Sequence, residues 1–257
     1  VSVAGLLKEG EALVTRRPFR SPHHTISQAA LIGGSAVPRP GMISLAHRGV
    51  LFLDELPEFQ RQTLDALRQP MEDRKVNISR ANGNVSYPSD FILVCAMNPC
   101  PCGYYPDRNR CHCSKIQIGK YMGRISGPIL DRMDLCVELQ PVEYASLKTK
   151  GTGERSKEIR QRVEQARQRQ KARLQGTPYG FNGDIEASAI GYYCALGSEE
   201  QSCMERLYRS LQLSARAYHR ILRVARTIAD LDGNEQIQVQ HLTEAACYRP
   251  SLEYWQI

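Results

Sequence analysis

Three short runs of apolar residues, each beside acidic or amide side chains, constrain the fold of this 257-residue chain more than any other feature. The runs are VLFL at 50–53, FILVCA at 91–96 and LCVEL at 135–139. The first ends at Asp54-Glu55, and Asn98 follows the second closely. Runs of this length with little alternation of apolar and polar residues are typical of strands buried on both faces of a parallel sheet. We therefore predict an α/β domain whose sheet is mostly parallel.

The segment between the first two runs predicts a helix and a β-hairpin. Residues 59–71 carry apolar side chains at a spacing of three and four residues, which is the spacing of one helix face: Leu64, Leu67 and Met71. Residues 75–80 and 85–87 then flank the dipeptide Asn82-Gly83. An Asn-Gly dipeptide between two short strands indicates a hairpin, because both residues tolerate the positive φ that tight turns require.

The pattern changes after residue 146, and we divide the chain into three parts. Residues 1–146 form the α/β core, with a cysteine-containing insertion at 99–114. Residues 147–178 form a basic linker whose helix, residues 155–174, has one apolar face: Ile159, Val163, Ala166 and Leu174. Gly and Pro residues break the chain at 176–183, and a helical pattern follows from Asp184, so residues 179–257 are predicted to form a small all-helical domain.

The net charge of +7 is concentrated in one segment. Ten Lys and Arg and three Glu lie between residues 147 and 175, so this segment accounts for the entire excess. A basic segment on a neutral body indicates contact with a polyanion, although a solvent-exposed helix explains the same composition. The candidate phosphate contacts are Arg160, Arg162, Arg167 and Arg169. No run approaches the roughly 18 apolar residues of a membrane span, which excludes an integral membrane protein.

Four of the nine cysteines follow the pattern C-x-C-x8-C-x-C: Cys100, Cys102, Cys111 and Cys113. Four thiolates close a tetrahedral Zn²⁺ site, and the polar residues between them have little core of their own and would gain stability from a metal. Free thiols in an oxidation-sensitive loop are the alternative, and His112 could replace one cysteine as a ligand.

An odd number of cysteines without a secretory signal favours a reducing compartment, the cytoplasm, over a disulfide framework. We interpret the adjacent His23 and His24 as hydrogen-bonding turn residues.

Asp54 and Glu55 end a buried strand in the Walker B pattern of nucleotide hydrolases. At the carboxyl edge of a sheet, Asp54 can hold Mg²⁺ through bound waters, and Glu55 can accept a proton from the water that attacks a γ-phosphate. Asn98, at the tip of the neighbouring strand, can orient that water. Each residue also has a structural alternative, because acidic residues commonly end strands and Asn commonly forms turns.

Six long stretches carry a resemblance to a known family: RRPFRSPHHTISQAALIGG (16–34), PRPGMISLAHRGVLFLDELPEF (38–59), LRQPMEDRKVNISR (67–80), AMNPCPCG (96–103), SGPILDRMDL (126–135) and SARAYHRILRVARTIADL (214–231). They are similar to the magnesium-chelatase-like branch of the AAA+ ATPases known as the YifB/ComM family. The resemblance covers nearly the whole chain. It implies an AAA+ core with a mostly parallel sheet, followed by a small all-helical lid domain.

The resemblance implies roles for individual residues of the core. Its Walker B pair and first sensor are Asp54, Glu55 and Asn98. Arg132 takes the place of the arginine finger, which reaches the γ-phosphate bound by the next subunit. A guanidinium suits this role, because the transferring phosphoryl group spreads charge over its equatorial oxygens. A buried partner of Asp131 or Asp134 is the alternative for Arg132.

Two further groups of residues take their roles from the resemblance. Arg216 matches the second sensor arginine, and Arg220 and Arg223 share its helix face. The hairpin at 75–87 corresponds to a hairpin that touches the DNA backbone inside related ring helicases, with residues 25–41 as a neighbouring insertion. Its candidate DNA contacts are Lys75, Arg80 and Asn82. A hairpin that only packs against a neighbour is the alternative.

One family element is missing from the sequence. The P-loop G-x-x-x-x-G-K-[ST] occurs nowhere in the 257 residues, and the order of motifs in the family places it upstream of Val1. This loop supplies the backbone N–H groups and the Lys that hold nucleotide phosphates. We therefore expect a fragment that carries half of a catalytic site, lacks the central strand before the P-loop and does not hydrolyse ATP by itself.

The leading functional hypothesis is an ATP-driven DNA motor that assembles into a ring, implied to be hexameric. The resemblance suggests a helicase or branch-migration factor, used in DNA recombination or in the uptake of transforming DNA during competence. Its cofactors would be ATP, Mg²⁺ and Zn²⁺, and its partners single-stranded or branched DNA and further copies of itself. A chelatase-type motor subunit and a non-catalytic zinc and DNA-binding module are the alternatives.

Overall fold

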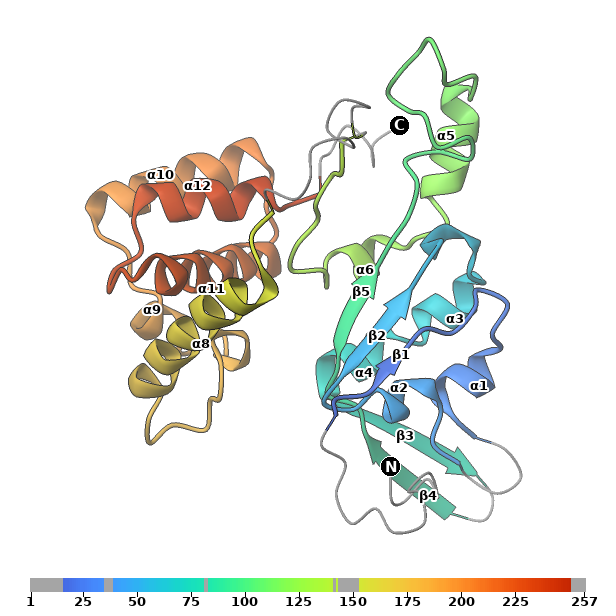
Figure 1. Cartoon of the computed structure of the whole chain (residues 1–257), viewed down its shortest axis with the longest axis horizontal. Helices are drawn as coiled ribbons and strands as arrows, with labels where there is room; N and C mark the ends of the chain where they lie inside the picture. The colour runs from blue at the N-terminus through green and yellow to red at the C-terminus, as the bar shows by residue number, and fades with distance from the viewer. Residues whose placement is uncertain (1–15, 35–38, 81–82, 141, 143–152, 251–257) are drawn as a thin grey trace. The chain divides into compact units, whose positions relative to one another are not determined.

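The computed structural model describes residues 16–34, 39–80, 83–140, 142 and 153–250. The chain divides into two compact units, the first ending at Arg132 and the second running from Met133 to Pro250. The first is mixed α/β and the second is helical, which confirms the predicted fold class (Figure 1). Among the described residues, no helix is both long enough and apolar enough to cross a membrane.

A three-stranded parallel sheet forms the centre of the first unit. Its strands are β1 (Phe19–Arg20), β2 (Val50–Leu53) and β5 (Ile92–Cys95), in the order β1-β2-β5. Two of them, β2 and β5, are the first two predicted strands, and they pair from Val50 opposite Ile92 to Leu53 opposite Cys95. Both strands therefore end at the same level, which brings together the residues that follow them.

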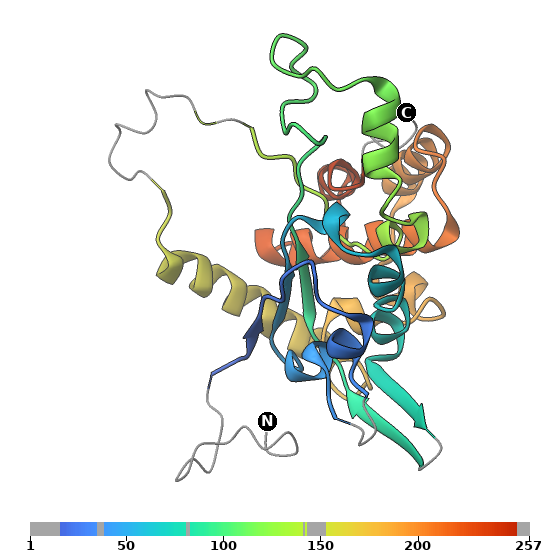
Figure 2. The ribbon, with the colours of Figure 1, turned by 90° about the vertical axis from the view of Figure 1, so that its right-hand side faces the viewer.

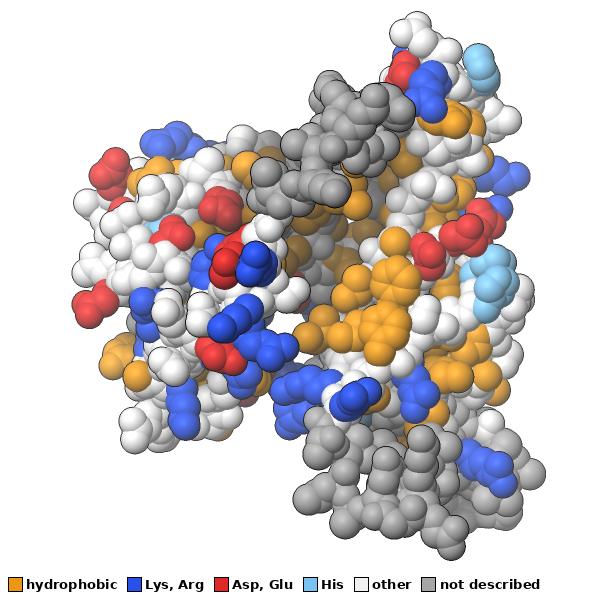
Figure 3. All heavy atoms as spheres, in the orientation of Figure 1, with side chains coloured by type: hydrophobic (Ala, Val, Ile, Leu, Met, Phe, Trp, Pro, Cys, Tyr) orange, Lys and Arg blue, Asp and Glu red, His pale blue; other side chains and the backbone are white. Residues whose placement is uncertain are grey.

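The prediction that these strands are buried on both faces is wrong for the described part of the chain. Leu51 and Leu53 of β2 are fully buried on one face. On the other face, Phe19, Ile92 and Val94 are 63%, 64% and 41% exposed. Figure 3 shows apolar side chains gathered over this part of the first unit. An apolar run indicates that a strand can be covered, but it does not show how many layers cover it.

Short helices complete the first unit: α1 (Gln28–Ile32), α2 (Met42–Leu45), η1 (Leu56–Glu58), α3 (Arg61–Asp65), α4 (Arg68–Asp73), α5 (Lys115–Met122) and α6 (Gly127–Leu130). The single helix predicted at 59–71 is wrong, because α3 and α4 are separate. Pro70 explains the break, since its ring would clash with the Ala66 carbonyl, four residues earlier, in a continuous helix. Leu64 and Leu67 are buried as predicted.

The predicted hairpin is present as a separate two-stranded sheet. It consists of β3 (Lys75–Arg80) and β4 (Gly83–Pro88), which pair antiparallel. Val76 and Ile78 are 2% and 4% exposed, so alternate residues of β3 face the core. The hairpin projects from one end of the first unit (Figures 1 and 2). Asn82, at its predicted tip, lies outside the described residues.

The third predicted strand, at 135–139, is wrong. These residues have no regular secondary structure, and Leu135, Val137 and Leu139 are 55%, 66% and 90% exposed. The Cys136 N–H donates to the Tyr248 carbonyl at 2.8 Å. A parallel strand forms only beside another strand that accepts and donates its ladder hydrogen bonds, and these residues pair with none of the described strands.

The second unit is built from α8 (Ser156–Arg173), η2 (Asn182–Asp184), α9 (Ile190–Tyr193), α10 (Ser198–Ser210), α11 (Ala215–Asp232) and α12 (Val239–Cys247). Several residues of α11 belong to its apolar core, among them Ile221, Leu222 and Ala225. The basic helix α8 packs against α11 and buries Ala166 and Leu174. Ile159 and Val163 are 42% and 43% exposed, so only half of the predicted apolar face is buried. The boundaries at 146 and 178 stay predictions.

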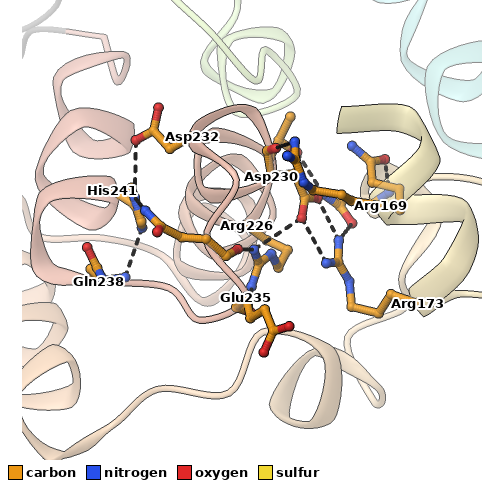
Figure 4. A network of polar contacts seen from close by, with 12 residues as sticks. Arg169, Arg173, Arg226, Asp230, Asp232, Glu235, Gln238 and His241 are labelled. Atoms are coloured by element: carbon orange, nitrogen blue, oxygen red, sulfur yellow. Dashed lines mark hydrogen bonds and ion pairs between the residues drawn. The ribbon is translucent and has the colours of Figure 1, made fainter. Parts of the chain in front are cut away.

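A buried carboxylate joins α8 to α11 (Figure 4). Asp230 is fully buried and accepts hydrogen bonds from both terminal nitrogens of Arg173, at 2.8 and 2.6 Å. Arg226, which is 2% exposed, lies 3.1 Å from the same carboxylate. Asn182 donates to it at 2.8 Å, and Arg169 donates to the Asp230 backbone carbonyl at 2.8 Å. Several donors therefore offset the cost of burying this charge.

Replacing Asp230 with Ala should lower the free energy of unfolding by about 3–5 kcal/mol, because the Arg226 guanidinium would stay buried without its counter-charge. Urea denaturation measures this change. Asp232→Ala is the matched control on the same helix, because Asp232 is half exposed and pairs with His241 at 3.3 Å. The loss should be smaller in this control, because Asp232 is half exposed and water solvates its carboxylate in the folded protein. Equal losses in the two variants would contradict the account of the network.

Candidate functional site

Three of the five candidate catalytic residues lie at the carboxyl end of the sheet. Asp54 and Glu55 follow β2 directly, and Asn98 lies three residues after β5, which pairs with β2 up to its last residue. All three side chains are exposed. The Asp54 Oδ1 atom accepts the Glu55 N–H at 2.9 Å. This edge of a parallel sheet is where α/β proteins bind their ligands.

Glu55 has an unusual backbone conformation. Its φ of 52° and ψ of 48° lie in the left-handed region, which costs a residue other than Gly roughly 1–2 kcal/mol. Hydrogen bonds on the following residues hold the turn: Leu56 N–H donates to the Ala96 carbonyl at 3.0 Å, and Glu58 N–H donates to the Glu55 carbonyl at 2.8 Å. Backbone strain of this kind gathers at functional sites. The position of Glu55 is therefore fixed by both β2 and the end of β5.

His24 is a neighbour of Glu55 that the sequence analysis missed. Its Nδ1 atom lies 3.2 Å from the Glu55 Oε2 atom. The interpretation of His23 as a turn residue fits the structure, because its Nδ1 atom lies 3.0 Å from the Thr25 hydroxyl. The histidine pair follows β1, which is parallel to β2, so both chain segments leave the sheet at the same edge. The two-residue strand β1 leaves no apolar run in the sequence, so no sequence signal placed His24 at this edge.

Arg132 pairs within the first unit. Its side chain is 8% exposed and donates to the Glu72 carboxylate at 2.6 Å and to the Pro128 carbonyl at 2.6 Å. The carboxylate in this ion pair, Glu72, is neither of the alternative partners Asp131 and Asp134 that the sequence suggests. The role of Arg132 as an arginine finger stays a prediction. In that role, its guanidinium would have to leave the Glu72 carboxylate and bind the γ-phosphate instead.

The three candidates for the second sensor lie on α11 in the second unit. Arg220 pairs with Asp134, and Arg223 donates to the Ile185 carbonyl at 2.9 Å. Arg216 is exposed. The role of Arg216 as the second sensor stays a prediction, with Arg220 and Arg223 as the other candidates on the same helix.

The candidate DNA contacts lie on two separate elements. Lys75 is exposed at the start of β3, and the backbone of Arg80 pairs with Gly83 beside the turn. On α8, all four predicted arginines are exposed: Arg160, Arg162, Arg167 and Arg169. Arg162 pairs with Glu154 at 2.9 Å, and the Arg167 guanidinium lies 5.3 Å from the centre of the Phe181 ring. Arg169, which contacts Asp230, has a structural role besides any role in binding.

The four cysteines of the C-x-C-x8-C-x-C pattern form a compact cluster between β5 and α5. All four Sγ atoms lie within 4.8 Å of one another, and those of Cys100 and Cys111 are 3.7 Å apart. Thiolates bound to zinc at about 2.3 Å in a tetrahedron lie about 3.8 Å apart, so this geometry fits a metal. A backbone hydrogen bond from Tyr104 lowers the pKa of Cys102 to about 6, whereas burial and the neighbouring thiols raise the pKa of Cys111 and Cys113. Within the described residues, His112 does not belong to the cluster.

Comparison with known proteins tests the resemblance. The family described as "Magnesium chelatase, subunit ChlI" matches residues 1–147, and the family of the ChlI C-terminal region matches residues 153–249. The chain belongs to the magnesium chelatase subunit ChlI family. The predicted AAA+ relationship, which rested on motifs such as the one at Asp54-Glu55, is thereby confirmed.

Individual relatives of this ChlI-family chain include both named members of the YifB/ComM group. The chain is 48% identical over 235 residues to the uncharacterized protein YifB of Escherichia coli, covering 91% of this chain and 46% of YifB. It is 46% identical over 242 residues to the competence protein ComM of Haemophilus influenzae, covering 94% and 47%. The magnesium-chelatase 38 kDa subunit of Acidiphilium rubrum is 25% identical over 113 residues, covering 44% and 27%. The chain thus spans about half the length of YifB and ComM.

Proposed function

We propose that the chain is part of an ATP-driven motor that acts on DNA. The observation that carries this proposal is the placement of Asp54 and Glu55 at the end of β2, beside Asn98 after β5, in a member of the ChlI family. The relative named as a competence protein supports a role in competence, and we place the motor in DNA recombination or the uptake of transforming DNA. The nine free cysteines support the predicted cytoplasmic location.

The three residues at the carboxyl end of the sheet have different roles in the proposed ATP hydrolysis. The exposed Asp54 carboxylate fits Mg²⁺, which prefers oxygen ligands and keeps most of its waters. Glu55 accepts a proton from the attacking water, and Asn98 orients that water. When bound, the nucleotide and its Mg²⁺ supply the reacting phosphate and neutralise its charge. The sequence contains no P-loop, so the groups that hold the β-phosphate must come from a longer chain.

A ring of identical subunits completes the proposed site. Arg132 would act on the nucleotide of the next subunit, and Arg216 on the nucleotide of its own. A residue that serves a neighbouring site needs a head-to-tail interface, and such an interface can close into a ring. A homo-hexamer is the ring size that the family resemblance implies.

The cysteine cluster should bind one Zn²⁺ per chain, because its four thiols already have the separation that a tetrahedral site requires. Elemental analysis of protein purified without added metal measures the stoichiometry. Cys111→Ser should lose the metal, whereas the control Cys247→Ser should keep it, since Cys247 is exposed and lies outside the cluster. Less than half a zinc per wild-type chain would contradict the assignment.

Reversing charge on α8 should weaken DNA binding about equally for all DNA sequences, because phosphate contacts carry no base information. Arg160→Glu with Arg167→Glu is the informative pair, since Arg162 and Arg169 also hold Glu154 and Asp230. Each lost contact should reduce the log–log slope of affinity against salt by about 0.7–0.9. Exposed arginines of α10 provide the control, Arg206→Glu with Arg209→Glu. If the α8 and α10 double variants lose DNA affinity equally, α8 is a solvent-exposed helix and not a specific DNA-binding surface.

The chelatase-type motor is the second candidate function, and the match to the 38 kDa magnesium-chelatase subunit favours it. DNA-stimulated ATP hydrolysis by a chain that includes the P-loop separates the candidates. A DNA motor should hydrolyse ATP faster when single-stranded or branched DNA is added. Hydrolysis that ignores DNA would favour the chelatase type, and DNA binding without hydrolysis would favour a non-catalytic zinc and DNA-binding module.

A further inference from the structure

The contact between His24 and Glu55 joins two different chain segments at the candidate catalytic edge. His24 follows β1, and Glu55 follows β2. The 3.2 Å separation of Nδ1 and Oε2 is within hydrogen-bond reach. The His24 side chain is 29% exposed, whereas that of Glu55 is 58% exposed. The histidine is thus the more enclosed partner, and the carboxylate reaches toward it from solvent.

Two aromatic contacts limit the movement of the His24 ring. The His23 ring packs against it at 4.0 Å between centroids, and Phe59 meets it edge-on at 6.4 Å. Phe59 is 2% exposed and belongs to the core of the first unit. The imidazole is therefore supported by a rigid part of the fold, which suits a residue that orients a neighbour.

We propose that His24 is a positioning residue for the Glu55 carboxylate, and this inference rests on the proposed role of Glu55 as general base. The Nδ1–H group donates to Oε2 and limits rotation of a side chain that solvent would otherwise leave free. The second oxygen, Oε1, stays available to accept a proton from water. A base that is oriented by a third group is the arrangement found in catalytic triads. The left-handed backbone of Glu55 fixes the other end of the same side chain.

The proposal predicts the position of the proton on two adjacent histidines. His24 donates from Nδ1, so its neutral form should carry the proton on Nδ1. His23 accepts the Thr25 N–H at Nδ1, at 3.4 Å, so its proton should lie on Nε2. Side-chain ¹⁵N chemical shifts of the histidine-labelled 257-residue chain, recorded well above the usual histidine pKa of about 6.5, distinguish the two forms.

Removing the carboxylate provides the test of this spectroscopic signature. In Glu55→Ala, the His24 signals should move toward the Nε2–H form while those of His23 stay unchanged. A wild-type His24 that carries its proton on Nε2, or a His24 that does not respond to Glu55→Ala, would overturn the proposal.

Kinetics test whether the contact positions the base. In a chain that includes the P-loop, His24→Ala should lower kcat at least about tenfold with KM nearly unchanged, a part of the 10²–10⁴-fold that a general base contributes. His24→Asn should recover most of the loss, because the Asn amide nitrogen can occupy the place of Nδ1. The matched control is His23→Phe, which keeps the ring contact and should stay within about twofold of wild type. In a Glu55→Gln background, His24→Ala should cause no further loss.

The outcomes separate this inference from the proposed function. A kcat for His24→Ala equal to or above that of wild type would overturn the positioning role, and an increase would show that His24 restrains the base. If the wild-type chain with its P-loop hydrolyses no ATP, the proposed function fails. The tautomer measurement then decides by itself whether His24 holds Glu55.

Discussion

Arg132→Ala should lower ATP hydrolysis about 10³–10⁵-fold in a chain that includes the P-loop, which is the usual contribution of an arginine finger. Nucleotide affinity should change little, because the guanidinium helps mainly in the transition state. In the structure, Arg132 is 8% exposed and pairs with Glu72. Its role at a neighbouring site therefore requires an exchange of Glu72 for the γ-phosphate. Steady-state turnover and equilibrium nucleotide binding measure the two quantities separately.

Glu72→Ala is the matched control for this prediction, because it removes the same ion pair and leaves the guanidinium in place. A loss of turnover in Glu72→Ala as large as that in Arg132→Ala would assign Arg132 a structural role. Mixing Arg132→Ala with Glu55→Gln subunits tests action between subunits, since a mixed ring contains interfaces with an intact base and an intact arginine. If mixing restores no activity, the action of Arg132 on a neighbouring subunit loses its main support.

The 257-residue polypeptide alone should show no Mg²⁺-dependent ATP turnover. Its candidate groups at Asp54, Glu55 and Asn98 position a metal and a water, but no P-loop is present to hold the β-phosphate. A chain extended upstream through the expected P-loop should gain nucleotide binding and turnover together. Nucleotide binding and phosphate release, assayed on both chains, provide the comparison. Turnover by the 257-residue chain that Glu55→Gln abolishes would contradict the prediction.

Several parts of the fold and the site could be predicted from the sequence because they depend on local patterns. The strands at 50–53 and 92–95 and the hairpin after Lys75 follow from apolar runs and an Asn-Gly turn. The cysteine cluster follows from spacing, because two C-x-C pairs separated by a short loop can meet without help from the rest of the chain. In each case, the interacting residues are near neighbours in the sequence.

Contacts between distant residues could not be predicted in the same way. The separations between His24 and Glu55 and between Arg132 and Glu72 are set by the packing of several elements. The apolar run at 135–139 has the composition of a strand, yet a strand also needs a partner edge. The exposed face at Ile92 depends likewise on which layers cover the sheet. The composition of a segment indicates which secondary structure it can form, but the elements that pack against it determine whether it forms that structure and is buried.

Strand separation on a forked DNA, driven by ATP and Mg²⁺, tests the central claim most directly. Wild-type protein with its P-loop should separate the strands, and Glu55→Gln should bind both ATP and the fork without separating them, because only proton transfer from the attacking water is lost. A Glu55→Gln variant that separates strands as fast as wild type would contradict hydrolysis at Glu55 as the source of movement. A wild-type protein that hydrolyses ATP but leaves the fork intact would contradict a DNA motor.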